Sequence, residues 1–457
     1  MNFSISKIDQ KWLVLIAIGM STFMSALDTS VVNIVLPVVN KSFNSEIATV
    51  EWVVIIYLLF VSGLLLSFGR LGDIRGHKSI FLIGFSIFII SSALCGGAPS
   101  IGALITFRGI QAIGAAMLAA NSPAILTTNF PASQRGQALG LQATMTYLGL
   151  TVAPSLGGWL TDLISWRAVF YINVPVGLLA FILAWLFIPQ DKDSGSRERF
   201  DIPGALLFLV GLVSLLLALN QGYSWGWSSP PIIGLFVFSV IFLTSFVYIE
   251  KKSSSPVLDL KLFRNKVFSA ATASSILNYI AVFSILILLP FYLLQGRGMS
   301  TSQAGLILTI QPIVMAIIAP ISGSISDRIG TRIPTVAGMI VLSLGILMMS
   351  TMGPNSPIYL VAIALGIIGF GTGTFISPNN SAIMGSATRE RQGIAAGILA
   401  TSRSTGMVLG VGLAGAIFTT ILAQSSGDAM FFYAVSTSLI VTSIIAGLGA
   451  LTSIIKG

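Results

Sequence analysis

The chain has 457 residues, of which 54% are hydrophobic and only 9% are charged, with a formal net charge of +9. A soluble protein has roughly 25% charged residues, so this composition cannot cover a soluble surface of that size. The apolar content excludes a disordered chain, and a single cysteine excludes a disulfide scaffold. The composition therefore predicts a polytopic membrane protein.

Apolar runs separated by charges and turn residues predict fourteen membrane-spanning helices. A helix needs about 20 mostly apolar residues to cross the hydrocarbon core, and several runs are longer, so we expect tilts or kinks. The first run is too long for a cleavable signal and is interpreted as the first span. In chain order the predicted spans are 11–36, 50–69, 79–97, 101–127, 136–160, 166–188, 203–221, 231–249, 267–294, 303–325, 333–351, 357–383, 392–422 and 430–454.

The basic residues orient these spans. With a cytoplasmic N-terminus, three of the 24 lysine and arginine residues fall outside (Lys41, Arg167 and Arg297) and two fall within spans (Arg108 and Arg403). The other 19 lie in cytoplasmic segments, as the positive-inside rule requires. Both termini are thus predicted to be cytoplasmic, and the net charge needs no nucleic acid as a partner.

Two longer hydrophilic connections, 190–201 and 250–266, bracket the seventh and eighth spans. We therefore expect an N-terminal six-helix bundle over residues 1–189 and a C-terminal six-helix bundle over residues 267–457. Residues 190–266 would form two inserted spans with flanking cytoplasmic loops.

An internal repeat supports this plan. GRLGDIRGHK (69–78) matches GSISDRIGTR (323–332), and the region 135–158 matches 391–415 at nearly the same offset. Two parallel six-helix halves are typical of alternating-access transporters. The aligned pairs are Gly69 with Gly323, Asp73 with Asp327, Gly76 with Gly330, and Lys78 with Arg332.

Asp28 is the only acidic residue well within a predicted span. A carboxylate there costs about 2.5–3.5 kcal/mol on insertion scales, so it should face the protein interior or a water-filled cavity. Loss of hydration disfavours its charged form, which would make it a reversible proton carrier; the structural alternative is a buried hydrogen-bond acceptor. Arg108 lies at a matching depth, ~10–12 Å below the outer boundary, with Gln111 on the same helix face. The two charges could respond to substrate or form a permanent structural pair.

Arg403 is the third intramembrane charge, and no acidic residue lies deep in the second block. We expect it to pair with backbone carbonyls, with amides such as Asn379 or Asn380, or with an anionic group of a substrate. Together with Asn33 and Gln111, these side chains are candidates for a substrate cavity.

The fifth span contains Gly149, Pro154, Gly157 and Gly158. Proline bends a helix and small residues permit close helix contact, so this span could seal the interface between the two halves against proton leak. The alternative is the ordinary enrichment of glycine and proline in membrane helices.

The cytoplasmic loop GRLGDIRGHK places one carboxylate, Asp73, among basic residues. We expect a charged latch that is remade between two rigid-body states. His77 is interpreted as one cationic or polar loop position, and a chain with one histidine offers no histidine metal site. The predicted latch residues are Gly69, Arg70, Asp73, Arg75, Gly76, Lys78 and Asp327.

These motifs resemble those of the major facilitator superfamily, and specifically its fourteen-span drug/proton antiporters. The resemblance rests on the loop above, LITFRGIQAIGAA (104–116), APSLGG (153–158), LDTSVVNIVLP (27–37) and SRSTGMVLGVGLAGA (402–416), and it covers nearly the whole chain. APSLGG resembles the antiporter signature GPxxGG, and the one departure is Ala153 where that signature has glycine.

The resemblance implies an all-α major facilitator fold. It implies that Asp28 takes part in proton coupling and that Arg108 supports proton transfer. It assigns Gly69, Asp73 and Gly76 to the conformational latch, and Pro154, Gly157 and Gly158 to the antiporter helix.

We therefore expect a proton-driven exporter of amphipathic compounds in the cytoplasmic membrane, with no cofactor beyond the proton gradient and no required oligomer. With one deep carboxylate, monovalent cations or neutral lipophiles are favoured over divalent cations. An alternative is export of a physiological metabolite, peptide or lipid, with Arg403 binding an anionic head group. An enzyme is disfavoured because one histidine, one cysteine and one deep carboxylate do not form a catalytic set. A further alternative is a sensor, which would bind ligand but show no proton-linked flux.

Overall fold

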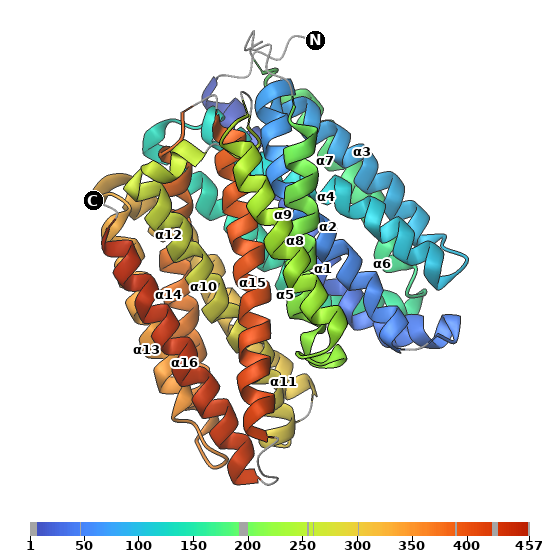
Figure 1. Cartoon of the computed structure of the whole chain (residues 1–457), viewed down its shortest axis with the longest axis vertical. Helices are drawn as coiled ribbons and strands as arrows, with labels where there is room; N and C mark the ends of the chain where they lie inside the picture. The colour runs from blue at the N-terminus through green and yellow to red at the C-terminus, as the bar shows by residue number, and fades with distance from the viewer. Residues whose placement is uncertain are drawn as a thin grey trace. The chain divides into compact units, whose positions relative to one another are not determined.

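A computed structural model describes residues 7–45, 47–191, 200–253, 256–258, 260–299, 301–388, 391–422 and 428–455. Within these ranges the regular structure is helical and includes no strand, which confirms the predicted all-α class (Figure 1). The longer helices are α1 (Lys7–Phe43), α2 (Ile47–Arg75), α3 (His77–Gly96), α4 (Ile101–Asn129), α5 (Arg135–Leu163), α7 (Asn173–Phe187), α8 (Ile202–Trp225), α9 (Pro230–Glu250), α10 (Lys266–Phe291), α12 (Ile310–Ile329), α13 (Arg332–Ser350), α14 (Ile358–Gly385), α15 (Gln392–Leu422) and α16 (Asp428–Ile454). The shorter ones are η1 (Ala132–Gln134), α6 (Ala168–Tyr171), η2 (Leu260–Arg264), η3 (Tyr292–Gly296) and α11 (Thr301–Leu308).

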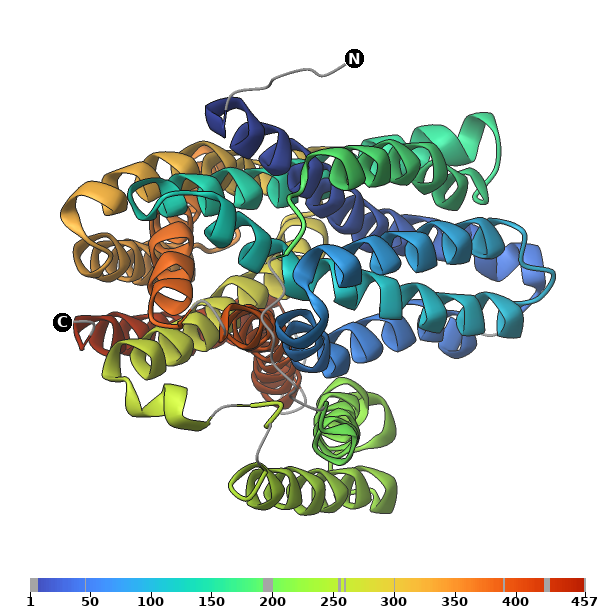
Figure 2. The same ribbon diagram turned by 90° about the horizontal axis from the view of Figure 1, so that it is seen from above.

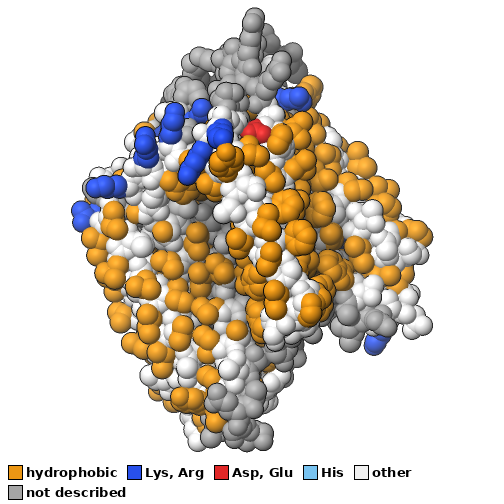
Figure 3. Space-filling view, in the orientation of Figure 1, with side chains coloured by type: hydrophobic (Ala, Val, Ile, Leu, Met, Phe, Trp, Pro, Cys, Tyr) orange, Lys and Arg blue, Asp and Glu red, His pale blue; other side chains and the backbone are white. Residues whose placement is uncertain are grey.

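Thirteen helical segments of the described chain are long and apolar enough to cross a membrane. The remaining predicted span corresponds to α5, which is 29 residues long. Large apolar side chains lie open on the helix surfaces, among them Trp185 (60% exposed) and Leu306 (75% exposed). Figure 3 shows that hydrophobic side chains dominate the flanks of the helices, whereas lysine and arginine gather near helix ends. The molecule is thus a multi-pass membrane protein.

The chain divides into two compact units. Unit 1 comprises residues 1–213, 241–260 and 387–400, and unit 2 comprises residues 214–240, 261–386 and 401–457. Unit 1 therefore holds α1 to α7 together with parts of α8 and α9 and the first turns of α15. The boundaries at residues 189 and 266 expected for a six-plus-two-plus-six arrangement stay a prediction.

The two units repeat the same packing order. In unit 1, α4 packs on α2 and α3, and α7 packs on α1 and α3; Figures 1 and 2 both show α2, α3 and α4 side by side. In unit 2, α14 packs on α12 and α13, and α16 packs on α10 and α13. Since α10, α12, α13, α14 and α16 follow one another as α1, α2, α3, α4 and α7 do, the packing agrees with the internal repeat.

The repeat extends to individual glycines. A side-chain carbon on Gly114 would lie 2.7 Å from the carbonyl oxygen of Gly84, and one on Gly371 would lie 2.8 Å from that of Gly338. Only glycine lets α3 approach α4, and α13 approach α14, this closely. At the aligned turns, Gly76 has φ +90° and Gly330 has φ +85°, a region that favours glycine.

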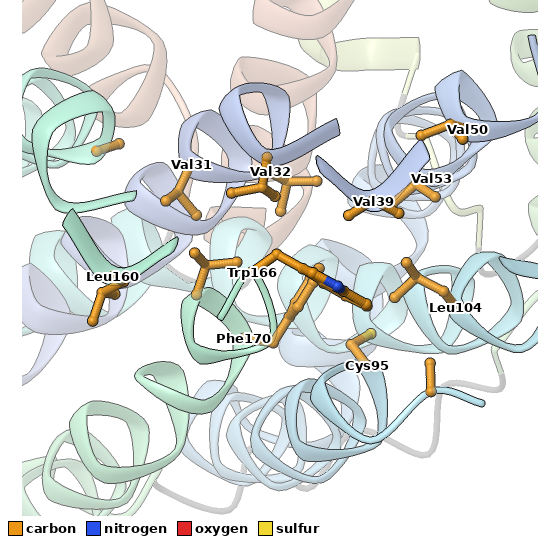
Figure 4. Close-up of a cluster of buried hydrophobic side chains, with 14 of the residues drawn as sticks. Val31, Val32, Val39, Val50, Val53, Cys95, Leu104, Leu160, Trp166 and Phe170 are labelled. Atoms are coloured by element: carbon orange, nitrogen blue, oxygen red, sulfur yellow. The ribbon is translucent and has the colours of Figure 1, made fainter. Parts of the chain in front are cut away.

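The apolar core of unit 1 adjoins the polar site described below (Figure 4). Residues 31, 35 and 39 of α1 are valines spaced four apart, so they share one helix face, and all three are buried. Trp166 lies against this face, with its ring 5.6 Å from Phe43 and 6.2 Å from Phe170. The core includes Leu27, the residue before Asp28, so it lies directly beside the polar site.

Candidate functional site

The centre of unit 1 holds a buried ion pair between α1 and α4. Nη1 of Arg108 lies 2.7 Å from Oδ2 of Asp28, and the two side chains are 1% and 0% exposed. The matched depth of these residues in the sequence permitted this contact, and the structure contains it. Two full charges in the interior require further hydrogen-bond partners, because burial removes their hydration.

Amide side chains complete the shell of the carboxylate. Oδ1 of Asp28 accepts hydrogen bonds from Nδ2 of Asn173 at 2.7 Å and from Nε2 of Gln111 at 3.2 Å. The same two amides donate to the hydroxyl oxygen of Ser92, at 3.0 and 2.7 Å. Gln111 also accepts from Nη1 of Arg108 at 2.7 Å. The pair thus belongs to a network that joins α1, α3, α4 and α7.

The guanidinium of Arg108 is held by α2 as well. Its Nε donates to the backbone carbonyl of Val53 at 3.2 Å. Its central carbon lies 4.1 Å from the ring centroid of Tyr57 and 5.8 Å from that of Phe170. A desolvated guanidinium over an aromatic face gains cation–π stabilisation, so Arg108 is fixed on several sides.

The carboxylate of Asp28 faces one cation and two amide donors, all of which stabilise negative charge. Because these partners come from α4 and α7, the carboxylate joins α1 to both helices.

Sequence reasoning missed three members of the network: Ser92, Asn173 and Tyr57. The available signal was weak. Asn173 is an amide in the apolar run of the sixth span, and Ser92 is one of two adjacent serines in the third. Neither carries a charge, so the cost of placing it in the membrane does not single it out.

The glycines of α5 pack against α1 on either side of Asp28. A side-chain carbon on Gly149 would lie 2.7 Å from the carbonyl oxygen of Phe23, and one on Gly157 would collide with Val31. A side-chain carbon on Gly158 would meet open space. The side chain of Pro154 lies outside the described residues. The close contacts that small residues were expected to provide are thus made within unit 1, between α5 and α1.

The carboxylate of the cytoplasmic loop binds the start of a helix. The carboxylate of Asp73 accepts hydrogen bonds from the backbone N–H groups of Gly393 at 2.6 Å and Ile394 at 2.9 Å, in the first turn of α15. Free amide groups and the positive end of the helix dipole make this terminus a good partner for an anion. Gly69 permits the approach, because any side chain there would collide with the carbonyl of Gly393.

One of the basic residues expected around Asp73 bonds to another part of the chain. Lys78 donates to the carbonyls of Trp185 and Ile188, the first at 2.8 Å, and Arg75 is exposed. A carboxylate satisfied by two rigid backbone amides does not require ordering of these long side chains. Arg70 is buried, and Asp327 lies partly exposed near the end of α12 in unit 2.

The remaining candidates for the substrate cavity lie in unit 2. Arg403 has its central carbon 5.6 Å from the ring of Tyr279. Asn379 is buried and donates to the carbonyl of Ala271 at 3.2 Å, whereas Asn380 is partly buried. The side chain of Asn33, in α1, lies outside the described residues. Among the proposed cavity residues, the structure joins Gln111 to the Asp28 site.

Comparison with known proteins identifies the family of the chain. It matches the Major Facilitator Superfamily over residues 18–411, with a further match over residues 271–454. It is 35% identical over 416 residues to the riboflavin transporter RibZ of Clostridioides difficile (strain 630), covering 91% of this chain and 89% of RibZ. It is also 35% identical over 414 residues to the multidrug resistance protein Stp of Mycobacterium tuberculosis (strain ATCC 25618 / H37Rv), covering 90% of this chain and 77% of Stp.

Solved structures agree on the fold. The human organic anion transporter MFSD10 (TETRAN) superposes with a TM-score of 0.69 at 14% identity, covering 97% of this chain and 99% of that one. The proton:xylose symporter XylE superposes with a TM-score of 0.68 at 15% identity, covering 98% and 95%. At such low identity these likenesses concern the fold.

Proposed function

Because the chain belongs to the Major Facilitator Superfamily, we propose that it is a proton-coupled antiporter that exports amphipathic or lipophilic small molecules by alternating access. The observation that carries this proposal is the buried pair of Asp28 and Arg108, a titratable carboxylate whose surroundings depend on the packing of four helices. The 35% identity of the chain to a multidrug resistance protein supports the substrate class.

In the proposed cycle, Asp28 exchanges Arg108 for a proton. While the pair is closed, the carboxylate is charged and the site favours the deprotonated carrier. A conformational change that moves α4 away from α1 leaves the carboxylate without its counter-charge, and it then takes up a proton. Coupling requires that substrate and proton bind the two conformations with different affinities.

The number of buried carboxylates limits the substrate class. Among the described residues, Asp28 is the one acidic side chain within a span that lies deep in the apolar region. One exchangeable charge suits a monovalent cation or a neutral lipophile. In proteoliposomes we expect a mono-cationic dye to be exported at least tenfold faster than a bis-cation of similar size, a factor that corresponds to ~1.4 kcal/mol. Equal rates would contradict this substrate class.

The decisive test compares ethidium transport by the wild type and Asp28→Asn in proteoliposomes with an imposed pH gradient. We expect gradient-driven flux in the wild type and its loss in the variant, because an amide cannot carry the proton. Asp201→Asn, which makes the same chemical change before α8, serves as the matched control and should retain flux. Gradient-driven flux that survives Asp28→Asn would move proton coupling away from this residue.

A second candidate function is transport of a physiological metabolite of the flavin type. The chain is as similar to RibZ as to Stp, and it spans more of RibZ (89% against 77%). Binding of labelled riboflavin to purified protein, competed by ethidium, distinguishes the two. Tight riboflavin binding that ethidium does not displace would favour the metabolite.

If Arg403 binds an anionic group of a substrate, Arg403→Ala should weaken the binding of anionic ligands and spare cationic dyes. If Arg403→Ala weakened the binding of anionic ligands and of cationic dyes to the same degree, this would argue against this role.

A further inference from the structure

We propose that His77 is a second proton-binding site, at the cytoplasmic end of unit 1, and that its protonated form stabilises the contact between Asp73 and α15. His77 is the only histidine in the chain and is the first residue of α3. It is 7% exposed, although the sequence suggested a cationic or polar loop position. Its two ring nitrogens face different elements, and these partners determine its protonation.

The first nitrogen faces Asn121 on α4. Nδ1 of His77 lies 2.8 Å from Oδ1 of Asn121. The orientation of this amide is set by its other end, because Nδ2 donates to the carbonyls of Met117 at 2.8 Å and Phe68 at 3.3 Å. Oδ1 of Asn121 can only accept, so Nδ1 of His77 must carry a hydrogen.

The glycine at position 72 leaves room for this hydrogen bond. A side-chain carbon on Gly72 would collide with Oδ1 of Asn121 and press on Nδ1 of His77. The motif GRLGDIRGHK thus contains both the histidine and the space that fixes its tautomer.

The second nitrogen faces the latch. Nε2 of His77 lies 3.5 Å from Oδ1 of Asp73, the same oxygen that accepts from the N–H of Gly393. In a neutral ring, the hydrogen already resides on Nδ1, and Nε2 presents a lone pair to a carboxylate. In the imidazolium form, Nε2 presents N–H and positive charge instead. Protonation therefore turns a repulsive contact into an attractive one.

The other charges near His77 act in the same direction. Asp191, which follows α7, also acts electrostatically on the ring and accepts a hydrogen bond from the N–H of Lys78 at 2.9 Å. The ammonium of Lys78 is turned to carbonyls at the end of α7, and Arg75 is exposed. Arg70 acts on Glu250 of α9.

Burial of the ring opposes the imidazolium most strongly, and the positive end of the α3 dipole, about half a charge, opposes it as well. The carboxylates of Asp73 and Asp191 and the hydrogen bond to Asn121 favour it and together outweigh these effects. The site therefore binds a proton in the described conformation. In an antiporter that admits protons to the cytoplasm, it would retain the latched conformation when the cytoplasm acidifies. This consequence alone rests on the proposed function.

Nuclear magnetic resonance of ¹⁵N-histidine tests the site directly, because the chain has one histidine and a tag without histidine adds none. We expect an imidazolium at about pH 6 that becomes the neutral Nδ1–H tautomer as the pH rises through the range in which histidine titrates. Asn121→Ala should convert the neutral ring to the Nε2–H tautomer common in water. A neutral Nε2–H ring in the wild type, or a ring that never becomes charged above about pH 5, would refute the proposal.

Cysteine labelling tests the effect on the latch. Leu66 is 1% exposed and is covered by Gly397 of α15, so Leu66→Cys on a Cys95→Ser background reports separation of α2 from α15. In inside-out vesicles without substrate or gradient, maleimide labelling is compared between His77 and His77→Arg, whose charge is permanent. The quantity compared is the labelling rate with His77 divided by the labelling rate with His77→Arg. Because both proteins carry the same thiol, the effect of pH on thiolate ionisation cancels in this ratio.

We expect the ratio of labelling rates to rise about fivefold from about pH 6 to about pH 8. His77→Gln, which has no charge at either pH, should label fast at both pH values. This variant distinguishes an effect of charge from misfolding in His77→Arg. A ratio that does not change with pH would refute the link between His77 and the latch. Neither measurement depends on transport, so failure here would leave the proposed antiport intact, and failure of antiport would leave this site intact.

Discussion

At the scale of single residues, the energetics of the site depend on which partner is removed. Arg108→Gln would leave the carboxylate of Asp28 buried with amide donors alone. Breaking a buried ion pair from one side typically costs about 3–5 kcal/mol, because the remaining charge is uncompensated. We expect the free energy of unfolding, measured with denaturant in detergent micelles, to fall by about this amount.

The double variant Asp28→Asn with Arg108→Gln provides the control, since it removes both charges and keeps side chains of similar size. It should be more stable than Arg108→Gln alone. If its loss of stability equals the sum of the two single losses, the two charges do not stabilise each other.

The residue scale also shows where charge guides prediction and where it does not. Asp28 and Arg108 stand out in the sequence because a charge within a span is costly. Asn173 and Ser92 are neutral and lie 145 and 64 residues away from Asp28 along the chain. Their importance follows from contact with the carboxylate, which only the folded chain creates.

At the scale of helices, α5 and α1 depend on glycine at the point of closest approach. Gly149→Ala places a carbon 2.7 Å from the carbonyl oxygen of Phe23, so the helices must move apart next to Asp28. Overpacking of this kind costs about 1–3 kcal/mol. We expect a lower melting temperature in detergent and slower gradient-driven flux.

Two further alanine variants calibrate this prediction. Gly158→Ala makes the same change on the same helix, but its side chain would enter open space, so it should leave stability unchanged. Gly406→Ala repeats the clash in unit 2, at 2.6 Å from the carbonyl oxygen of Ile276, and should destabilise as Gly149→Ala does. Equal effects of Gly149→Ala and Gly158→Ala would show that helix propensity, and not contact, is responsible.

At the scale of the whole molecule, charge placement predicts the orientation in the membrane. We expect alkaline phosphatase to be active when inserted between α8 and α9, at residues 226–229, and inactive when fused after the C-terminus. Green fluorescent protein should behave in the opposite way at the two sites, because it requires the cytoplasm. The same activity at both sites would mean that one span has been miscounted, since each span reverses the side of everything after it.

The sequence by itself determined the membrane class, the helical spans, the internal repeat and the buried charges. These depend on local properties, namely the length of an apolar run, the cost of a charge within it and the need for glycine at a turn. The match of Gly76 with Gly330 is one example, because both turns adopt positive φ.

Only the tertiary structure decided which side chains meet. Asp73 binds the first turn of α15, 320 residues further along the chain. Likewise, His77 is enclosed by α2 and α4, and Asn173 reaches Asp28 from α7. Hydropathy adds up along a segment and can be evaluated locally, whereas a hydrogen bond or a tautomer depends on atoms that distant segments bring within about 3 Å.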